Sequence, residues 1–196
     1  MTVTEKNIRT IALRHFARNG FEGASLADIA AEVGIKKPSI YNHFKSKDDL
    51  FLAVYQNVAG RELEFVEHYL KPERMLDLES QLRGLLVGYK ERYEREEDTK
   101  FFLRMSFFPP AHLLEPSLKL SLAYIDRMNE LAQTLFLAAH KRELIHRDVT
   151  VEQAAGAYVA VLDSLFVEML YGDYEHFEKR IDAAWPIFWR GVRNRD

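Results

Sequence analysis

Residues 25–44 read S-L-A-D-I-A-A-E-V-G-I-K-K-P-S-I-Y-N-H-F, and this stretch decides the fold. Two short helices, the second beginning after Lys36, are expected to meet at Gly34, a residue type that can adopt the left-handed backbone of a sharp turn. Ser25 is well placed to cap the first helix. Pro38 fits the first turn of the second helix, where no backbone N–H is needed. The spacing predicts a helix-turn-helix.

The second of these helices carries the functional expectation. The major groove of DNA is wide enough to admit one helix, and a helix-turn-helix projects its second helix into that groove. Ile40 and Phe44 are expected to face the core, so the polar residues between and beside them stay outside. The predicted DNA contacts of this helix are Lys37, Ser39, Tyr41, Asn42 and His43. The pattern alone is also compatible with an ordinary corner of two helices.

The rest of the chain is predicted to be helical. Among its 196 residues glycine (9) and proline (6) are scarce, and apolar residues recur at helical spacing almost throughout. The expectation is an all-α fold of about nine helices. They are placed at about 4–19, 26–33, after 36, 47–70, 75–96, 99–107, 113–141, 151–171 and 174–193.

The long helix at about 47–70 is the expected connector between two domains. We predict a helix-turn-helix DNA-binding domain over residues 1–47 and a helical bundle for ligand binding and dimerisation over residues 48–196. The charge distribution agrees with this division, because residues 1–47 carry a net charge of +4 and the whole chain carries −3. A basic head on an acidic body is expected when only the head meets phosphate.

A longer stretch, F-A-R-N-G-F-E-G-A-S-L-A-D-I-A-A-E-V-G-I-K-K-P-S-I-Y-N-H-F-K-S-K-D-D-L, resembles the N-terminal domain of the TetR family of bacterial regulators. The resemblance covers roughly residues 5–58. It rests on residues that match in order and spacing, namely Phe16, Gly20-Phe21, Ser25, Ile29-Ala30, Val33-Gly34, Ile40-Tyr41, His43-Phe44, Lys47 and Leu50. It implies a homodimer in which each head reads one half-site of a palindromic operator on double-stranded DNA.

The resemblance also implies roles for single residues. Lys47 matches a lysine of the fourth helix that touches the DNA backbone, and Ser25 matches a helix cap that can meet a phosphate. The sequence departs from the family at Lys36, where Ser or Thr is usual, and at Pro38, where Gly is usual. Lys36 cannot accept a capping hydrogen bond, but it adds a cation near phosphate, so it joins the predicted DNA contacts.

A ligand pocket is expected in the C-terminal domain. Residues 101–108 read F-F-L-R-M-S-F-F, and pockets for small molecules are usually apolar and aromatic with a few polar anchors. The candidate wall residues are Tyr89, Tyr93, Phe101, Phe102, Met105, Phe108, Tyr124, Met128, Tyr158, Leu162 and Phe166, with Arg104 or His112 as anchors of an acidic group. Large apolar residues at helical spacing usually belong to an ordinary core, which is the favoured interpretation of each single residue, and the expected cavity rests mainly on the resemblance.

The last two helices are the expected dimer interface, because their apolar stripes are broad and rich in aromatic residues. The candidate residues are Leu165, Met169, Ile181, Trp185, Phe188 and Trp189. Two such helices from each subunit would form a four-helix bundle. The alternative is that Trp185 and Trp189 complete the core of one chain.

Other kinds of chemistry have no support in the sequence. There is no cysteine, no pair of histidines at metal-binding helical spacing, no glycine-rich phosphate loop and no G-x-S-x-G motif. We therefore expect no enzymatic activity, no metal and no cofactor. The charged N-terminus is unlike a signal peptide, and no apolar run approaches the roughly 20 residues of a membrane helix, so a cytoplasmic protein without a membrane partner is predicted.

The hypothesis from sequence is a repressor released from its operator by a small apolar or aromatic effector. The ligand would stabilise a spacing of the two heads that no longer matches successive major grooves. Two alternatives stay open: an activator of the same fold, and a constitutive DNA-binding protein without a ligand.

Overall fold

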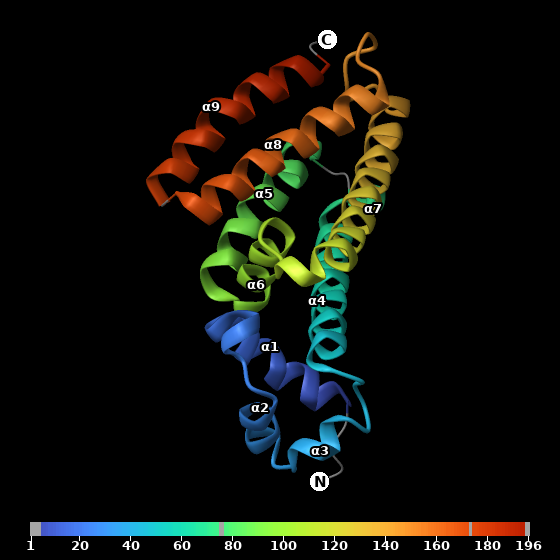
Figure 1. Ribbon diagram of the computed structural model, residues 1–196. Coiled ribbons are helices and arrows are strands. Elements are labelled where there is room, and N and C mark those ends of the chain that lie inside the picture. The colour runs from blue at the N-terminus through green and yellow to red at the C-terminus, as the bar shows by residue number, and fades with distance from the viewer. Residues whose placement is uncertain (1–4, 75–76, 173, 195–196) are drawn as a thin grey trace. The chain divides into compact units, whose positions relative to one another are not determined.

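The chain is helical along its described length, which covers residues 5–74, 77–172 and 174–194 of a computed structural model. These ranges hold nine α-helices and two short 3-10 helices, with a single isolated bridge between Ile145 and Arg193. The α-helices are α1 (Glu5–Gly23), α2 (Leu26–Val33), α3 (Lys37–Ile40), α4 (Lys47–Tyr69), α5 (Leu78–Arg95), α6 (Glu97–Phe107), α7 (Leu114–Lys141), α8 (Val151–Tyr171) and α9 (Tyr174–Val192), and the 3-10 helices are η1 (Pro72–Arg74) and η2 (Ala111–Leu113) (Figure 1). The all-α prediction is confirmed.

The first helix ends later than predicted. Its expected stop was Asn19-Gly20, but α1 continues to Gly23 across a kink at Gly20, which has φ 68° and ψ 178°. Glycine tolerates this positive φ without a steric penalty. The backbone N–H of Ala24 then donates to the carbonyl of Gly20 over 3.2 Å. Glycine therefore bends the chain here as expected, while the hydrogen bonding resumes for one more turn.

The fifth helix begins later than predicted. The expected start was residue 75, and the described helix α5 starts at Leu78, after the 3-10 turn η1. Asp77 caps this start, because its carboxylate accepts from the backbone N–H of Glu79 over 3.1 Å. The expected helical residues 4, 75 and 76 and the predicted break at Asp173 lie outside the described residues.

The helices divide into two units. Unit 1 comprises residues 1–61 and 95–122, and unit 2 comprises residues 62–94 and 123–196. Helices α4 and α7 each contribute to both units. The two packing units thus do not coincide with the domain boundary predicted at residue 47. That boundary separates DNA binding from ligand binding and dimerisation, and it stays a prediction.

Unit 1 is built around aromatic side chains of α1, α4 and α6. Phe21 and Phe16 both meet the ring of Phe51 edge to face, at centroid distances of 5.3 and 5.2 Å. Phe51 in turn contacts Phe101 at 5.8 Å. Such edge-to-face pairs add to the stability gained from burial alone. They attach α1, which supports the helix-turn-helix, to the body of this unit.

Unit 2 contains α5, α8 and α9, together with the remaining parts of α4 and α7. Helix α8 begins with a capping box, in which Thr150 and Gln153 each accept a hydrogen bond from the backbone N–H of the other. Tyr158 lies fully buried on α8 and donates to the carbonyl of Leu82 on α5 over 2.8 Å. Helices α8 and α9 run side by side (Figure 1).

Helix α8 is long and apolar enough to cross a membrane by length and composition alone, with a mean hydropathy of 1.4 over 18 of its 21 residues, although charged residues interrupt its apolar run. The physical reason is that α8 buries apolar residues on two sides, against α5 and against α9. A core helix of this kind passes the same test as a membrane span, so the finding is weak evidence for a membrane.

Candidate nucleic-acid interface and sensing region

The turn between α2 and α3 is defined by short-range hydrogen bonds. Ser25 caps α2 as predicted, with its hydroxyl accepting from the backbone N–H of Ala27 over 3.1 Å. Gly34 ends the helix with φ 83°, also as predicted. The N–H of Ile35 donates to the carbonyl of Ala30 over 2.9 Å and the N–H of Gly34 donates to Ala31 over 3.1 Å. This pair of bonds is a Schellman motif, which reverses the chain direction within two residues.

Helix α3 is short, but its helical path continues beyond Ile40. The backbone N–H groups of His43 and Phe44 both donate to the carbonyl of Ile40, over 2.9 and 3.0 Å. Lys36 precedes the helix and provides no side-chain cap, as the sequence indicated. Ile40 and Phe44 are buried at 0% and 3% exposure, and they fix the inner side of this segment.

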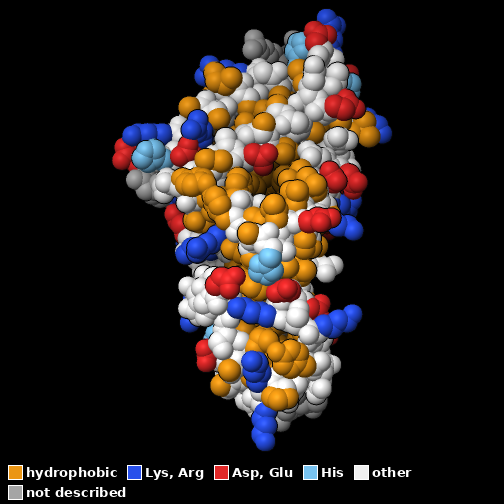
Figure 2. Space-filling model, in the orientation of Figure 1, with side chains coloured by type: hydrophobic (Ala, Val, Ile, Leu, Met, Phe, Trp, Pro, Cys, Tyr) orange, Lys and Arg blue, Asp and Glu red, His pale blue; other side chains and the backbone are white. Residues whose placement is uncertain are grey.

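The outer side of α3 carries the predicted DNA contacts. Lys36, Lys37, Asn42 and His43 are exposed, and Tyr41 is 50% exposed. Ser39 is half-buried. Figure 2 shows basic side chains standing out from the end of unit 1 that carries α2 and α3. The structure thus gathers hydrogen-bonding groups and cations on the exposed side of one short helix, and a major groove admits one helix.

Lys47 is held in place by the last turn of α1. Its ammonium lies 4.4 Å from the centre of the Phe21 ring and donates to the carbonyl of Glu22 over 3.3 Å. An ammonium has three donors, so this position leaves hydrogens for a phosphate. Ser46 caps α4, since the N–H of Asp49 donates to its hydroxyl over 3.1 Å.

An ion-pair cluster joins α1 to α2. Glu32 accepts from His15 over 2.7 Å and pairs with Arg14 over 2.7 Å. The hydrogen bond from His15 is the largest effect on Glu32 and holds its pKa below the ordinary value of 4.5; burial, the next largest effect, opposes it, and the charges of Arg14 and His15 add to the lowering. This cluster fixes the supporting helix against the first helix of the helix-turn-helix.

The predicted ligand residues of unit 1 differ in burial. Phe101, Phe102 and Met105 are buried in its core, where Phe102 packs on Tyr55 at 5.9 Å. Arg104 and Phe108 are exposed. Packing alone accounts for the buried members, and a ligand role for all of them stays a prediction.

His112 lies against the head of the molecule. Its ring is 4.9 Å from Phe21, and its Nε2 is 3.4 Å from a carboxylate oxygen of Asp48. A side chain predicted to anchor a ligand thus connects η2 to the beginning of α4. Arg18 on α1 makes a second connection of this kind, to Glu97 on α6 over 3.0 Å.

In unit 2 the structure brings several predicted ligand residues together. The hydroxyls of Tyr89 and Tyr124 are 2.5 Å apart, and the Tyr89 ring meets Phe166 at 5.0 Å. Burial, reinforced by Tyr124, raises the pKa of Tyr89 well above its ordinary value of 10.0. Met128, Leu162 and Tyr158 are also buried in this unit. The group has the mixture of aromatic walls and few polar atoms that ligand sites share.

Sequence reasoning missed the charged pair beside these tyrosines. Glu62 has 0% exposure, and Arg92 donates to its carboxylate over 2.8 Å. The guanidinium of Arg92 also lies 4.6 Å from the centre of the Phe65 ring. A signal was present, because Glu62 follows Val58 and precedes Val66 by four residues, which puts it on the apolar face of α4.

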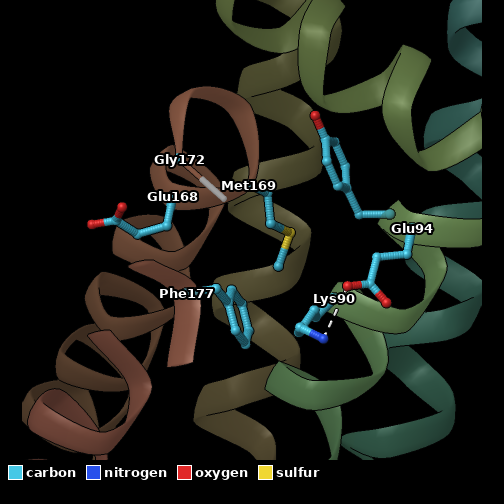
Figure 3. Close-up of a pocket in the computed structure, with 7 residues that line it drawn as sticks. Lys90, Glu94, Glu168, Met169, Gly172 and Phe177 are labelled. Atoms are coloured by element: carbon cyan, nitrogen blue, oxygen red, sulfur yellow. Dashed lines mark ion pairs between the residues drawn. The ribbon is translucent and has the colours of Figure 1, made fainter. Parts of the chain in front are cut away.

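A small pocket in unit 2 lies beside this region. It measures about 120 Å³ and is lined by Lys90, Tyr93, Glu94, Glu168, Met169, Gly172 and Phe177 (Figure 3). Its Lys90 pairs with Glu94 over 3.0 Å. The volume is close to the roughly 150 Å³ of a cavity that holds benzene, and well below that of a drug-sized site. Tyr93 is the link between this pocket and the ligand residues predicted from sequence.

The predicted interface residues are largely covered within the single chain. Leu165, Met169, Ile181, Trp185 and Phe188 are all buried, and Trp189 is half-buried and stacks on Trp185 at 6.0 Å. Trp185 also donates to Glu79 on α5 over 3.3 Å. The two helices direct other apolar residues outward, with Val167 at 43%, Tyr171 at 68% and Ile187 at 70% exposure.

The described residues hold no group of three or more His, Cys, Asp or Glu side chains placed to bind a metal ion.

Comparison with known proteins agrees with the head described above. Residues 8–54 match the family described as bacterial regulatory proteins, tetR family. The chain is 32% identical to the HTH-type transcriptional regulator AcrR of Shigella flexneri over 108 residues, which are 53% of this chain and 48% of that protein. It is 33% identical to the HTH-type transcriptional repressor AcnR of Corynebacterium diphtheriae over 78 residues, 40% of this chain and 41% of that protein.

The alignments therefore span about half the length of these curated relatives. A solved structure described as a TetR-family transcriptional regulator of Mesorhizobium loti superposes on this chain with a TM-score of 0.78 at 21% sequence identity. The superposition covers 97% of this chain and 96% of the Mesorhizobium loti chain. At this identity the likeness concerns the fold alone.

Proposed function

The chain belongs to the TetR family through its N-terminal residues 8–54, and from that premise we propose that it is a DNA-binding transcriptional regulator. It acts in the cytoplasm as a repressor, bound to a palindromic operator and released by a small apolar or aromatic ligand. Repression, as opposed to activation, is supported by the relative AcnR, which is described as a transcriptional repressor.

The observation that carries the proposal is the polar edge of α3. Its inner side is fixed by Ile40 and Phe44, and the Schellman turn at Gly34 fixes its direction. A rigid edge of this kind can place Tyr41 and its neighbours against base edges, while Lys36 and Lys37 meet phosphates. Lysines that neutralise phosphates release counterions, so their contribution depends on salt.

The test measures the binding of a labelled random-sequence duplex by fluorescence anisotropy over a series of salt concentrations. Each lysine that contacts a phosphate should steepen the slope of log K against log salt by about 1. We expect Lys37→Ala to reduce the slope by about that amount, and Lys119→Ala, an exposed lysine of α7, to leave it unchanged. Equal slopes for all three proteins would remove α3 from the interface.

The ligand is proposed to bind in unit 2, near the Tyr89–Tyr124 pair. Aromatic walls and a few buried polar atoms support this position. A ligand that binds one spacing of the heads better than another would shift the dimer away from DNA. A panel of aromatic compounds screened for release of labelled operator tests the proposal, with Tyr124→Phe as the variant that should weaken release. Release that is unchanged in this variant would contradict the position.

The homodimer is proposed to form through the outward face of α8 and α9. Tyr171 and Ile187 are the most exposed large apolar side chains among the described residues. Gly156 and Gly191 have open space where a side chain would stand, so a partner helix can approach closely. Ile187→Glu should lower the mass measured by light scattering to that of one chain. Asp182→Ala, also exposed on α9, should leave the mass unchanged.

A further inference from the structure

A hollow in unit 2 lies where α7 ends and the chain leads into α8. It measures about 830 Å³, and its lining comes from the stretch between residues 140 and 147 and from Asn194, which follows α9. Figure 1 shows the α7–α8 loop and the end of α9 together at one end of this unit. The described lining shares no residue with the proposed DNA, ligand or dimer surfaces.

The wall of the hollow is held by hydrogen bonds between the α7–α8 loop and the end of α9. The N–H of His146 donates to the carbonyl of Val192 over 2.8 Å, and the N–H of Asn194 donates to the carbonyl of Leu144 over 3.0 Å. The side-chain amide of Asn194 also donates to the carbonyl of Glu143 over 3.1 Å. These bonds give the loop a fixed course along the end of α9.

Glu143 occupies a position in this wall where glycine is usual. Among the described residues it is the single residue other than glycine with a positive φ, at 56°. The N–H of Leu144 donates to the carbonyl of Ala139 over 3.0 Å, a bond typical of helix ends that glycine terminates. A residue with a side chain costs stability in this left-handed conformation. The rim of the hollow thus carries a charged side chain where glycine would be more stable.

The hollow is lined mainly by groups that can carry positive charge. They are Lys141, Arg142, Arg147, His140 and His146. The chain outside residues 1–47 is acidic, because those residues carry +4 and the whole chain carries −3. A cationic lining therefore stands out against the rest of the chain. The side chain of Arg147 is 91% exposed and lies 3.8 Å from its neighbour Asp148, so its guanidinium is free to turn toward an anion.

We propose that this hollow binds a phosphorylated small molecule. Guanidinium groups match the geometry of phosphate oxygens, and an ammonium adds a point charge. A phosphate ester or diphosphate carries at least two negative charges at neutral pH, which Lys141, Arg142 and Arg147 can balance against Glu143. The volume of about 830 Å³ is within the range of small-molecule sites.

A small ligand fits this arrangement better than a nucleic acid does. The cations surround a hollow, whereas proteins that bind nucleic acids carry them in a stripe or patch that follows the phosphate backbone. Glu143 and Asp148, whose side chain is 77% exposed, stand beside the cations. An extended polyanion would meet these carboxylates, while a small anion can pair with the cations inside the hollow.

The experiment is isothermal titration calorimetry of the full chain with inorganic pyrophosphate as the probe. The wild type should bind one pyrophosphate per chain. Arg147→Ala and Lys141→Ala should each weaken binding by roughly tenfold, the effect of one lost charge-assisted hydrogen bond. Arg83→Ala, an exposed arginine of α5 outside the described lining, should bind as the wild type does. No binding by the wild type, or equal affinities in all four proteins, would overturn the proposal.

Glu143→Gln provides a test that misfolding cannot imitate. It keeps the length of the side chain and removes a negative charge from the lining, so pyrophosphate should bind severalfold more tightly. Unchanged or weaker binding would contradict the cationic character of the site.

The DNA-binding head is a second place where an anion can meet lysines. Lys37→Ala should therefore leave pyrophosphate binding unchanged, while Arg147→Ala should leave the affinity for duplex DNA unchanged. Loss of pyrophosphate binding in Lys37→Ala alone would place the anion on α3 and overturn the proposal. Weaker DNA binding in Arg147→Ala would assign the hollow to nucleic acid and contradict a small phosphorylated ligand. Both results can be obtained whether or not the protein proves to be a repressor.

Discussion

The turn between α2 and α3 and the interior of unit 2 depend on interactions that differ in sequence separation. At the α2–α3 turn, the capping bond of Ser25, the bonds that end α2 at Gly34 and the bonds of His43 and Phe44 to the carbonyl of Ile40 all join residues at most five positions apart. In unit 2, Glu62 meets Arg92 and Tyr89 meets Tyr124 across 30 and 35 residues of chain. The α2–α3 turn is therefore specified by local signals, and the interior of unit 2 by pairings that only the fold creates.

This difference leads to different expectations for substitutions in the two parts. A locally specified head can keep the geometry that DNA requires while the rest of the chain changes. A buried charged pair is costly to assemble, and its removal affects the whole unit that encloses it. Substitutions in unit 2 should therefore act mainly on stability and ligand response, and substitutions on α3 mainly on DNA affinity.

The largest effect is expected from Glu62→Ala. It leaves the guanidinium of Arg92 without its carboxylate inside unit 2, and breaking a buried pair costs about 3 kcal/mol when one partner is partly exposed. Urea unfolding measures the loss. Glu64→Ala, an exposed residue of the same helix, should change stability by less than about 0.5 kcal/mol. Similar losses of unfolding free energy in both variants would show that the Glu62–Arg92 pair does not contribute more to stability than an exposed residue does.

Tyr41→Ala should weaken operator binding by roughly 1–3 kcal/mol, the range for loss of a key contact. Because Tyr41 is 50% exposed, the free energy of unfolding should stay almost unchanged. Anisotropy titration measures the affinity, and Tyr41→Phe separates the contribution of the ring from that of the hydroxyl. Full affinity in Tyr41→Ala would remove this residue from the DNA-binding set.

Gly34→Ala should destabilise the head by about 1–2 kcal/mol, because alanine at a left-handed position is strained. The surrounding space is open, so the cost comes from the backbone and not from a clash. Gly60 in α4 offers the control, since alanine there should stabilise by up to about 1 kcal/mol. Thermal unfolding followed by circular dichroism compares the two, and a loss at Gly60 equal to that at Gly34 would argue against the Schellman turn.

The smallest effect concerns pH. The pKa of Glu32 is lowered in the folded state, so its pairing with His15 stabilises the protein above the ordinary value of 4.5 and is lost as pH falls through the folded-state pKa. Wild type should therefore be more stable than Glu32→Gln at neutral pH, and the gap should narrow below pH 4.5. Urea midpoints at several pH values measure the gap. A gap that does not change with pH would remove the ionised carboxylate from the explanation.

Sequence reasoning succeeded where the signals are local. The helix-turn-helix, its cap at Ser25, its turn at Gly34 and the all-α fold follow from spacing and turn chemistry, and the structure confirms them. The predicted end of α1 at about residue 19 is too early. Glycine is a usual helix terminator, but here the helix continues past the kink at Gly20 to Gly23.

The rest depends on which faces meet. Trp185 and Phe188 have the composition of an interface, but α5 and α8 cover them within one chain. His112 has the chemistry of a ligand anchor, yet the fold sets it beside Phe21 and Asp48. A periodic pattern indicates that a residue is covered without naming what covers it. The roles of these residues in ligand binding and dimerisation therefore stay predictions.

The central claim is that this chain reads DNA as a dimer through α3. Selection of binders from a random duplex pool with purified protein, at one fixed moderate salt concentration, tests it most directly. The account predicts recovery of a palindrome whose half-sites lie about one helical turn apart, roughly 34–36 Å. Recovery of no shared motif, with only weak binding that disappears as salt rises, would contradict it.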